Sequence, residues 1–423
     1  MMWKKTTIAA CCVLPLLLSC ADPGTRTITW AVGKDPTGRH QALVDAFCRR
    51  HPGITVKLLE MPESSTAQHD AYVTHLAAAD QSIDIYSIDI IWTAEFANAG
   101  WLSPLGGHVD TLQLKEFLPG TVAGCRYRDT LWALPWFTDA GLLFSRADIL
   151  SESGSPVPKT WQQLETAAAR LGAKHGMTGY VWQGQQYEGL VCNFLEVLWS
   201  CGGDLFDSTG RPSLDSPEAA QAVAIMKRMF DGNASPPGVL TYKEEEARQL
   251  FTGGQAVFMR NWPYAWALAQ DAAKGSAVTG RVMLSALPAP AGRGPASCLG
   301  GWNLAVSRFS KNQADAVALV EHLTSFEAQK DFALNGGRLP TRSAVYADGE
   351  VRRAYPHFEQ LYAAFRTARP RPVRPDYPAL SDEIQLGLHR ALAGNVTVAQ
   401  ALRELQERLM RMTSPAARRE RGT

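Results

Sequence analysis

The alternation of strand-like and helix-like segments between residues 27 and 89 constrains the fold of this chain more than any other feature. Its strand-like segments are "TITWAVG" (27–33), "ITVKLLEM" (54–61) and "IDIYSID" (83–89), and its helix-like segments span 39–51 and 67–79. Such a β-α-β-α-β opening favours an α/β fold with a mostly parallel sheet, whose ligands lie beyond the carboxyl ends of the strands. We therefore expect the loops 33–38 and 62–68 and the turn at Asp89 to face one crevice.

A second α/β pattern begins near Ala140, and a chain of 423 residues exceeds what one core supports, which predicts two lobes. Thr160 and Gln163 form the capping box of one helix, and a further helix opens at Ser216. Other helices are expected over 187–200, 313–323 and from 381 onward, and strands over 255–261, 281–290 and 300–307. The Pro-rich stretch 368–378 must be extended, so it is either a linker or a strap across the surface.

Composition excludes a nucleic-acid partner. Hydrophobic residues make up 46% of the chain and charged residues 20%, which is typical of a globular protein. The formal net charge is +1, and the Lys and Arg residues are dispersed rather than gathered in a stripe. A neutral ligand fits this balance better.

The first twenty residues have the pattern of an export signal. Lys4 and Lys5 precede an apolar run, 8–18, that is too short to remain as a membrane-spanning helix. Its ending "LLSC" (17–20) resembles a bacterial lipobox, in which cleavage before Cys20 leaves that residue to carry a lipid. The alternative is an ordinary signal peptide with an incidental Cys. The lipobox predicts a mature chain that is anchored to the membrane on the periplasmic side.

The remaining cysteines do not form a metal or disulfide pattern. Five follow Cys20, at positions 48, 125, 192, 201 and 298, with no C-x-x-C spacing. We expect no metal site and mostly buried thiols, although one disulfide, whose pairing the sequence does not define, stays open.

Common enzyme signatures are absent, whereas aromatic residues alternate with polar ones at predicted strand ends. No G-x-S-x-G, H-E-x-x-H or phosphate-loop motif occurs. The mixed segments are "DIIW" (89–92), "PWFTD" (135–139), "VWQGQQYEG" (181–189), "RNWPYAW" (260–266) and "GGWN" (300–303). Sugars need this combination, because their C–H faces stack on rings while their hydroxyls bind carboxylates and amides. The alternatives are that the Trp residues are core, Asp89 a helix N-cap and Asp139 a structural carboxylate.

These residues resemble those of a known family. "IDIYSIDIIWTAEFANAGWLSPL", "LWALPWFTDAGLLFSRADIL", "GYVWQGQQYEGLVCNFLE", "FMRNWPYAWAL", "LGGWNLAVS" and "ALAGNVTVAQAL" are similar to segments of family 1 extracellular solute-binding proteins of ABC importers, in their trehalose/maltose-binding branch. The resemblance implies a two-lobe, hinge-connected periplasmic binding protein fold of type II, closing over a sugar of disaccharide size. It implies a signal peptide at 1–19, an anchored linker at 20–26, a first lobe of 27–137 and 284–338, a second lobe of 138–283 and 339–411, and a flexible tail at 412–423.

The same resemblance implies roles for individual residues. Asp89 and Asp139 accept hydrogen bonds from the sugar, Gly301 makes a backbone contact, and Arg371, with Arg369 as its competitor, donates. Stacking or edge contacts are implied for Phe137, Trp262, Tyr264 and Trp302. Asp35, Ser65 and His69 are the candidates in the first two loops. Phe137 stands where the family often has Tyr, so one hydroxyl contact is lost and the sugar is not identified.

The resemblance also implies partners and leaves rival functions. The partners are the saccharide and an ABC permease with a cytoplasmic ATPase; no cofactor is implied, and we expect a monomer that is not an enzyme. A glycosidase that uses Asp89 and Asp139 as its two carboxylates is one alternative, because it also needs aromatic platforms across a cleft. A surface lipoprotein without a transport role is another.

Overall fold

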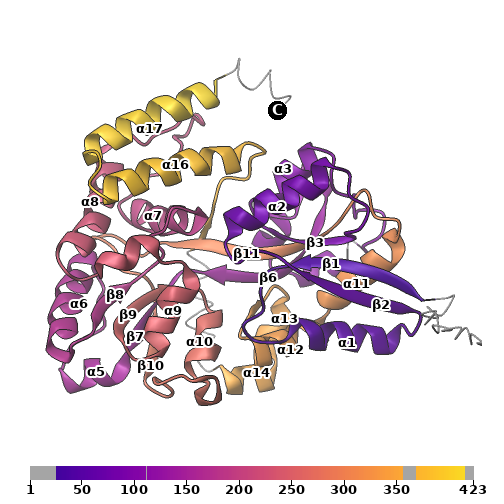
Figure 1. The fold of residues 1–423 in the computed structure, drawn as a ribbon, viewed down its shortest axis with the longest axis horizontal. Coiled ribbons are helices and arrows are strands. Elements are labelled where there is room, and N and C mark those ends of the chain that lie inside the picture. Colours follow the sequence, from indigo (N-terminus) through magenta and orange to yellow (C-terminus); the bar gives the residue numbers. More distant parts are fainter. Residues whose placement is uncertain (1–24, 111, 356–367, 415–423) are drawn as a thin grey trace, which may run out of the picture.

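The structure is a computed structural model that describes residues 25–110, 112–355 and 368–414. It has two α/β lobes side by side, with the long strands β6 and β11 passing between them (Figure 1). The sheet of the first lobe has the order β12-β6-β11-β3-β1-β2, and β13 pairs with β11. Its strands are β1 (Arg26–Val32), β2 (Ile54–Glu60), β3 (Ile85–Asp89), β6 (Ala133–Ala140), β11 (Ser297–Val306), β12 (Leu339–Pro340) and β13 (Ala368–Pro370).

The predicted β-α-β-α-β opening is confirmed. Strand β1 lies parallel to both β2 and β3, and helices α1 (His40–Arg50) and α2 (Ser65–Ala77) connect the three strands in turn. The prediction of a mostly parallel sheet is wrong beyond these strands. Strands β6 and β11 pair antiparallel with each other, and β11 with β3, because they cross from the other lobe and not by β-α-β connections.

The rest of the first lobe covers and extends this sheet. Helices α11 (Gln313–Leu323) and α12 (Phe326–Gly336) follow β11, and α11 has the bounds that its spacing predicted. Shorter elements follow β3: α3 (Thr93–Asn98), the 3-10 helix η1 (Gln113–Glu116), α4 (Pro119–Ala123), and the β4 (Arg126–Tyr127) and β5 (Thr130–Leu131) hairpin.

The second lobe is built on a four-stranded sheet of order β10-β7-β9-β8. Its strands are β7 (Leu142–Arg146), β8 (Thr178–Val181), β9 (Ala256–Asn261) and β10 (Val282–Ser285). Its helices are α5 (Ala147–Glu152), α6 (Trp161–His175), α7 (Glu188–Ser200), α8 (Pro217–Asp231), α9 (Glu244–Thr252), α10 (Tyr264–Ala269), α16 (Tyr377–Leu392) and α17 (Val398–Met412), with 3-10 turns η2 (Pro237–Thr241) and η3 (Ala272–Lys274). The capping box of Thr160 with Gln163 and the cap at Ser216 are both confirmed.

The lobe boundaries differ from those predicted, because the crossing strands stay paired further than the sequence pattern indicates. Strand β6 remains paired with β11 as far as Ala140, so the first crossing comes at Gly141 rather than after residue 137. Residues 284 and 285 still belong to β10 in the second lobe. Strand β12 pairs with β6, while Val345 of α13 (Ser343–Ala347) and Val351 of α14 (Gly349–Ala354) join the second lobe's hydrophobic cluster.

The structure tests only part of what the sequence predicted for the two ends of the chain. Strand β1 already begins at Arg26, within the predicted linker, and α17 ends at Met412, where the tail was expected to start. The signal peptide, Cys20 and residues 415–423 lie outside the described residues. None of the helices in the described ranges combines the length and apolar character that a bilayer crossing requires.

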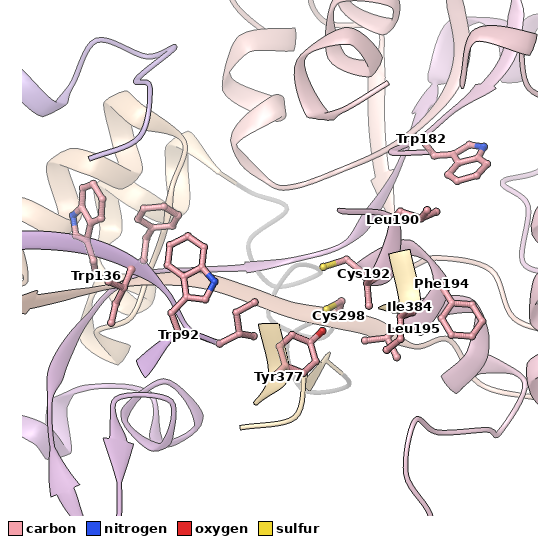
Figure 2. Packing of buried hydrophobic residues seen from close by; sticks show 14 of the residues in the cluster. Trp92, Trp136, Trp182, Leu190, Cys192, Phe194, Leu195, Cys298, Tyr377 and Ile384 are labelled. Atoms are coloured by element: carbon pink, nitrogen blue, oxygen red, sulfur yellow. The ribbon is translucent and has the colours of Figure 1, made fainter. Parts of the chain in front are cut away.

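A continuous hydrophobic core runs from the first sheet into the second lobe along the crossing strands. Figure 2 shows Trp92 and Trp136 on one side, Phe194 and Ile384 on the other, and Cys192 and Cys298 between them. All five cysteines of the described chain are free thiols, and four of them are buried, with Cys48 half-buried. The Pro-rich stretch begins as β13, which pairs with β11. Of the two alternatives, it is therefore a strap and not a free linker.

Candidate functional site: a carboxylate-lined cavity between the lobes

A cavity of about 460 Å³ lies where the two lobes meet. The carboxyl ends of β1, β2 and β3 contribute to its wall, as the sequence pattern predicted for a ligand site in this fold. Ten of the eleven predicted ligand-binding residues line it: Asp35, Ser65, Asp89, Phe137, Asp139, Trp262, Tyr264, Gly301, Trp302 and Arg371. The fold therefore brings together residues that are spread over more than three hundred positions of the sequence.

His69 is the predicted residue that the structure does not bring to this cavity. It lies on α2 with its Nε2 atom 2.7 Å from Glu95 Oε2. Its ring lies against those of Trp92 and Phe96. Burial lowers the pKa of His69, but the hydrogen bond and the charge of Glu95 outweigh burial and raise it. His69 thus ties α2 to α3 and is not in position to contact a ligand.

Asp139 is a buried carboxylate with an unpaired oxygen. Every residue of its strand β6 is buried, its side chain lines the cavity, and only 4% of Asp139 is exposed. Its Oδ1 atom has no hydrogen-bond partner among the described residues. Burial, with a smaller contribution from the charges of Asp89 and Glu244, outweighs the opposing effect of Arg338 and Arg260 and raises the pKa of Asp139 to about 7. The interpretation of Asp139 as a structural carboxylate is therefore not supported by any bond to its own fold.

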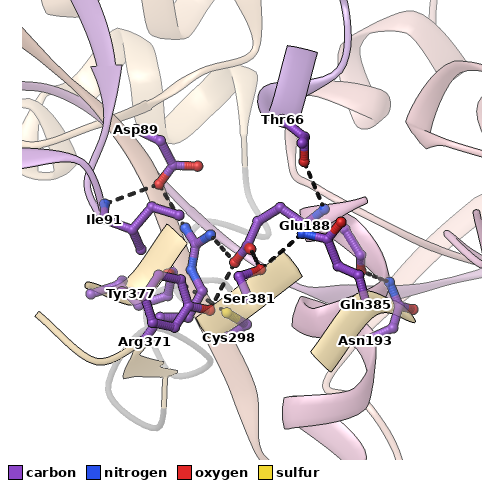
Figure 3. Close-up of polar contacts among 12 residues, drawn as sticks. Thr66, Asp89, Ile91, Glu188, Asn193, Cys298, Arg371, Tyr377, Ser381 and Gln385 are labelled. Carbon is purple, nitrogen blue, oxygen red and sulfur yellow. Dashed lines mark hydrogen bonds and ion pairs between the residues drawn. The ribbon is translucent and has the colours of Figure 1, made fainter. Parts of the chain in front are cut away.

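Asp89, in contrast, is satisfied by Arg371. Arg371 donates from Nη2 to Asp89 Oδ1 over 2.8 Å and from Nη1 to Glu188 Oε1 over 2.7 Å (Figure 3). Asp89 Oδ1 also accepts from the backbone N–H of Ile91 at 3.2 Å, whereas α3 begins only at Thr93 with Trp92 as its N-cap. The N-cap interpretation of Asp89 is wrong, because this carboxylate joins β3 to the strap.

Glu188 makes the same cluster a junction between the lobes. Tyr377 donates to Glu188 Oε1 over 2.9 Å, and Ser381 donates to Oε2, so α16 is held by the same carboxylate (Figure 3). The backbone N–H of Glu188 donates to Thr66 Oγ1 on α2 over 3.3 Å. The cluster of Asp89, Glu188 and Arg371, which we call the arginine junction, therefore links β3, α7 and the strap.

Arg369 does not share this position. It pairs with Asp204 on the surface at 2.5 Å, with side-chain exposures of 47% and 41%, and it does not line the cavity. Between the two arginines that the sequence left open, Arg371 alone reaches the cavity.

The aromatic platforms are oriented by the first turn of α9. Trp262 donates from Nε1 to Glu244 Oε1 over 3.2 Å, and Tyr264 donates from its hydroxyl to Glu245 Oε1 over 2.7 Å. The guanidinium of Arg260 lies 3.9 Å from the centre of the Trp262 ring, a cation–π contact from within the second lobe. These hydrogen bonds lie within the protein, so both rings are held at the cavity independently of any ligand.

Two glycines allow the hinge strands and Trp262 to pack this closely. A Cβ on Gly300 would lie 3.1 Å from the Trp262 ring and 3.2 Å from Asp139 Cβ. Gly301 has φ of 139°, and a Cβ there would lie 2.6 Å from the carbonyl oxygen of Phe137. A side chain on Gly300 would separate Asp139 from Trp262, and one on Gly301 would separate β6 from β11.

Sequence reasoning missed the cationic and acidic residues that complete the cavity. Arg338 stacks between Phe137 and Tyr264, with its Cζ 4.6 Å and 4.7 Å from the two ring centres. Further lining residues are His40, Glu63, Glu188 and Glu244. The run "EEE" at 244–246, opening a helix, is a signal that could have indicated a carboxylate wall, whereas "GGRLP" at 336–340 gives no sign that Arg338 lies between two rings.

Comparison with known proteins identifies the class that this fold and cavity define. The family of bacterial extracellular solute-binding proteins matches residues 34–330, and the chain belongs to that family. A probable ABC transporter-binding protein of Deinococcus radiodurans is 37% identical over 378 residues, which covers 87% of this chain and 89% of that protein. The structure of maltose-bound MalE3 from T. maritima superposes with a TM-score of 0.87 at 41% identity, covering 91% of this chain and 99% of that one.

A more distant relative has a different sugar in its name. The mannitol-binding protein of Pseudomonas aeruginosa is 26% identical over 430 residues, with 96% of each chain covered. The two-lobe fold and the sugar-binding ABC solute-binding class are thus established for this chain, and its family and fold are those of substrate-binding proteins rather than enzymes.

The arginine junction predicts unequal roles for its two candidate arginines. Arg371→Met leaves Asp89 and Glu188 buried without their partner, so the free energy of unfolding should fall by about 3 to 5 kcal/mol. Arg369→Met removes an exposed pair and should cost less than about 1 kcal/mol. Urea unfolding of both variants measures the difference. Equal losses would show that the junction does not hold the fold together.

Asp139 predicts a pH-dependent stability with a defined sign. In the unfolded chain an Asp loses its proton near pH 4, whereas the folded chain keeps it until about pH 7, so stability should fall as pH rises between these values. Asp139→Asn has the same shape and no charge. We expect it to melt higher than the unmodified protein at pH 8 and to lose this advantage at pH 5. A lower melting temperature at pH 8 would contradict an unpaired Asp139.

Proposed function

We propose that this chain captures a disaccharide-sized carbohydrate of the maltose or trehalose type by lobe closure and delivers it to an ABC permease that a cytoplasmic ATPase drives. The observation that carries the proposal is Asp139, a buried carboxylate that makes no hydrogen bond among the described residues and lines a cavity walled by Trp262, Tyr264 and Trp302. Sugar hydroxyls supply the donors that this carboxylate lacks, while the rings receive the apolar faces of the sugar.

The names of similar proteins support a carbohydrate ligand without identifying it. One similar structure holds maltose and one relative is named for mannitol, so disaccharides and polyols both occur around this chain. The cavity volume of about 460 Å³ falls in the range of small-molecule sites.

We further propose that the ligand is bound and not cleaved. A glycosidase needs one carboxylic acid to protonate the leaving group and a second carboxylate opposite it. Of the two candidates, Asp89 Oδ1 already accepts hydrogen bonds from Arg371 and Ile91, so this carboxylate is bonded within the fold, although burial raises its pKa. Asp139 then acts alone, as an acceptor for ligand hydroxyls.

The proposal extends to cellular location. A monomer anchored through Cys20 on the periplasmic side of the cell membrane would meet solutes before they reach the permease. Substitution Cys20→Ser should move the protein from the membrane fraction to the soluble extracytoplasmic fraction and leave sugar binding unchanged. Retention in the membrane at the original level would contradict the anchor.

A thermal-shift panel of mono-, di- and trisaccharides, followed by calorimetric titration, tests the function. A ligand at about 100 times its dissociation constant stabilises the folded form by roughly 2.7 kcal/mol. Loss of a hydrogen bond to a charged group costs about 1.5 to 3 kcal/mol, so Asp139→Ala should weaken binding by about tenfold to more than a hundredfold. Asp45→Ala, which removes an exposed carboxylate from α1, is the matched control and should bind normally.

Two outcomes contradict this proposal. Either no saccharide shifts the melting temperature, or Asp139→Ala binds as tightly as the control. Small-angle scattering adds a test of lobe closure, because a saturating saccharide should reduce the radius of gyration. Identical scattering curves would contradict closure around the ligand.

A further inference from the structure

We propose that the cavity prefers saccharides that carry a protonated amine over their neutral counterparts, and excludes sugar acids and sugar phosphates. The inference rests on the proposed function and names the ligand class of the same site. It follows from the sign and the placement of the charges that line the cavity.

The wall of the cavity has a strong excess of negative charge. Nine carboxylates line it, at Asp35, Glu60, Glu63, Asp89, Asp139, Glu188, Glu244, Glu245 and Glu246. Its basic residues are Lys34, His40, Arg338 and Arg371. Burial, together with the charge of Arg338 and against the effect of Asp35, lowers the pKa of His40 to about 4, so His40 is neutral at pH 7. Nine carboxyl groups thus face three cations, although the whole chain carries only +1, and Asp139, with its pKa of about 7, is only partly ionised at pH 7.

Several of these carboxylates are not neutralised within the fold. Arg371 serves both Asp89 and Glu188, and Glu245 pairs with Arg248 at 2.7 Å. Within the described chain, Glu63, Asp139 and Glu244 have no Lys or Arg partner at ion-pair distance. A cleft with low-dielectric walls focuses the field of such charges, which attracts cations and repels anions.

Two of the unneutralised carboxylates flank the same ring. Glu244 accepts from Trp262 Nε1 at one edge of the indole. Asp139 lies toward the other edge, because a Cβ on Gly300 would be within 3.2 Å of both Asp139 Cβ and the six-membered part of the indole. An ammonium group bound in the cavity against Trp262 would meet the negative π-cloud of the ring, the carboxylate of Asp139 and the field of Glu244 together.

The cation that contacts this ring does not cancel the attraction. Arg260 is paired in bidentate fashion with Glu196, at 2.9 Å and 2.5 Å, and both side chains are fully buried. Its charge is therefore balanced within the second lobe. Arg338 also lines the cavity and its charge acts on Asp139, but it forms no ion pair or hydrogen bond with that carboxylate, so the ammonium of a ligand would be its first directly bonded cation.

Closure of the lobes adds to the same preference. Glu63, in the loop before α2, lines the cavity together with Glu245 and Glu246 of α9 and lies near enough for their charges to act on it. Burial raises the pKa of Glu63, and the charges of these two glutamates raise it further. Bringing these like charges together opposes closure, and a bound cation offsets the repulsion, whereas a carboxylate or phosphate on the ligand increases it.

Two matched ligand series test the inference by calorimetric titration at pH 7. The first is maltitol, 1-amino-1-deoxymaltitol and maltobionate, which differ only in an alcohol, an ammonium or a carboxylate at C1. The second is glucose, glucosamine and glucuronate. In this series the charged group is on a monosaccharide and lies at positions other than C1. In at least one series the amine should bind about tenfold more tightly than the neutral member, and the acid should bind more weakly than both.

The charge of Asp139 should be the cause of this preference. In Asp139→Asn the ratio of amine to neutral affinity should fall toward one, while Asp45→Asn, an exposed site on α1, should keep it. The ratio should also fall as salt rises from low to high ionic strength. A ratio that Asp139→Asn leaves unchanged would overturn the assignment of the amine to this carboxylate.

The failures of the two proposals are distinguishable. If neutral saccharides bind and the amines bind no tighter in either series, the amine inference is overturned and the proposed function stands. If none of the saccharides of the panel or of the two series binds, the proposed function fails and the inference fails with it.

Discussion

The arrangement of this site depends on one guanidinium, that of Arg371, held between two carboxylates that the sequence separates widely. It reaches Asp89 at the end of β3 and Glu188 at the start of α7, so a single side chain joins the first sheet, the second lobe and the strap. Pairs of this kind are costly to form and more costly to break, because each removed partner leaves a buried charge. The junction therefore fixes where β3, α7 and α16 meet, and the cavity is the space that remains beside it.

The junction also decides which carboxylate is left for a ligand. Arg371 pairs with Asp89 and Glu188, and Arg260 pairs with Glu196. Neither arginine therefore bonds to Asp139. Keeping an unpaired carboxylate in an apolar surrounding costs stability, and the raised pKa of Asp139 expresses that cost. We propose that a donor-rich ligand recovers this cost on binding, so that stability given up by the fold contributes to affinity, which is a common reason for local inconsistency at functional sites.

Local signals in the sequence predicted much of this fold. The box of Thr160 with Gln163 and the spacing of 313–323 gave correct helices because capping and amphipathic periodicity act within a few residues. Ten predicted site residues line the cavity, and they could be predicted because the motifs shared with the family indicated their positions in the sequence. The lobe boundaries were wrong because pairing of β6 with β11 is a contact between distant segments. Two tertiary contacts could not be predicted from local sequence patterns. They are the pairing of Asp89 with Arg371, which lie 282 positions apart, and the hydrogen bond between His69 and Glu95.

We infer that Asp139 is kept without a protein partner so that a ligand can provide one. Carbon-13 NMR of the Asp139 carboxyl, titrated with and without the tightest saccharide of the panel, tests this directly. Without ligand the pKa should be about 7. With saturating saccharide it should fall toward the ordinary value for an aspartate, about 4, because donated hydrogen bonds stabilise the charged form. An Asp139 pKa that saturating saccharide leaves unchanged would contradict the account.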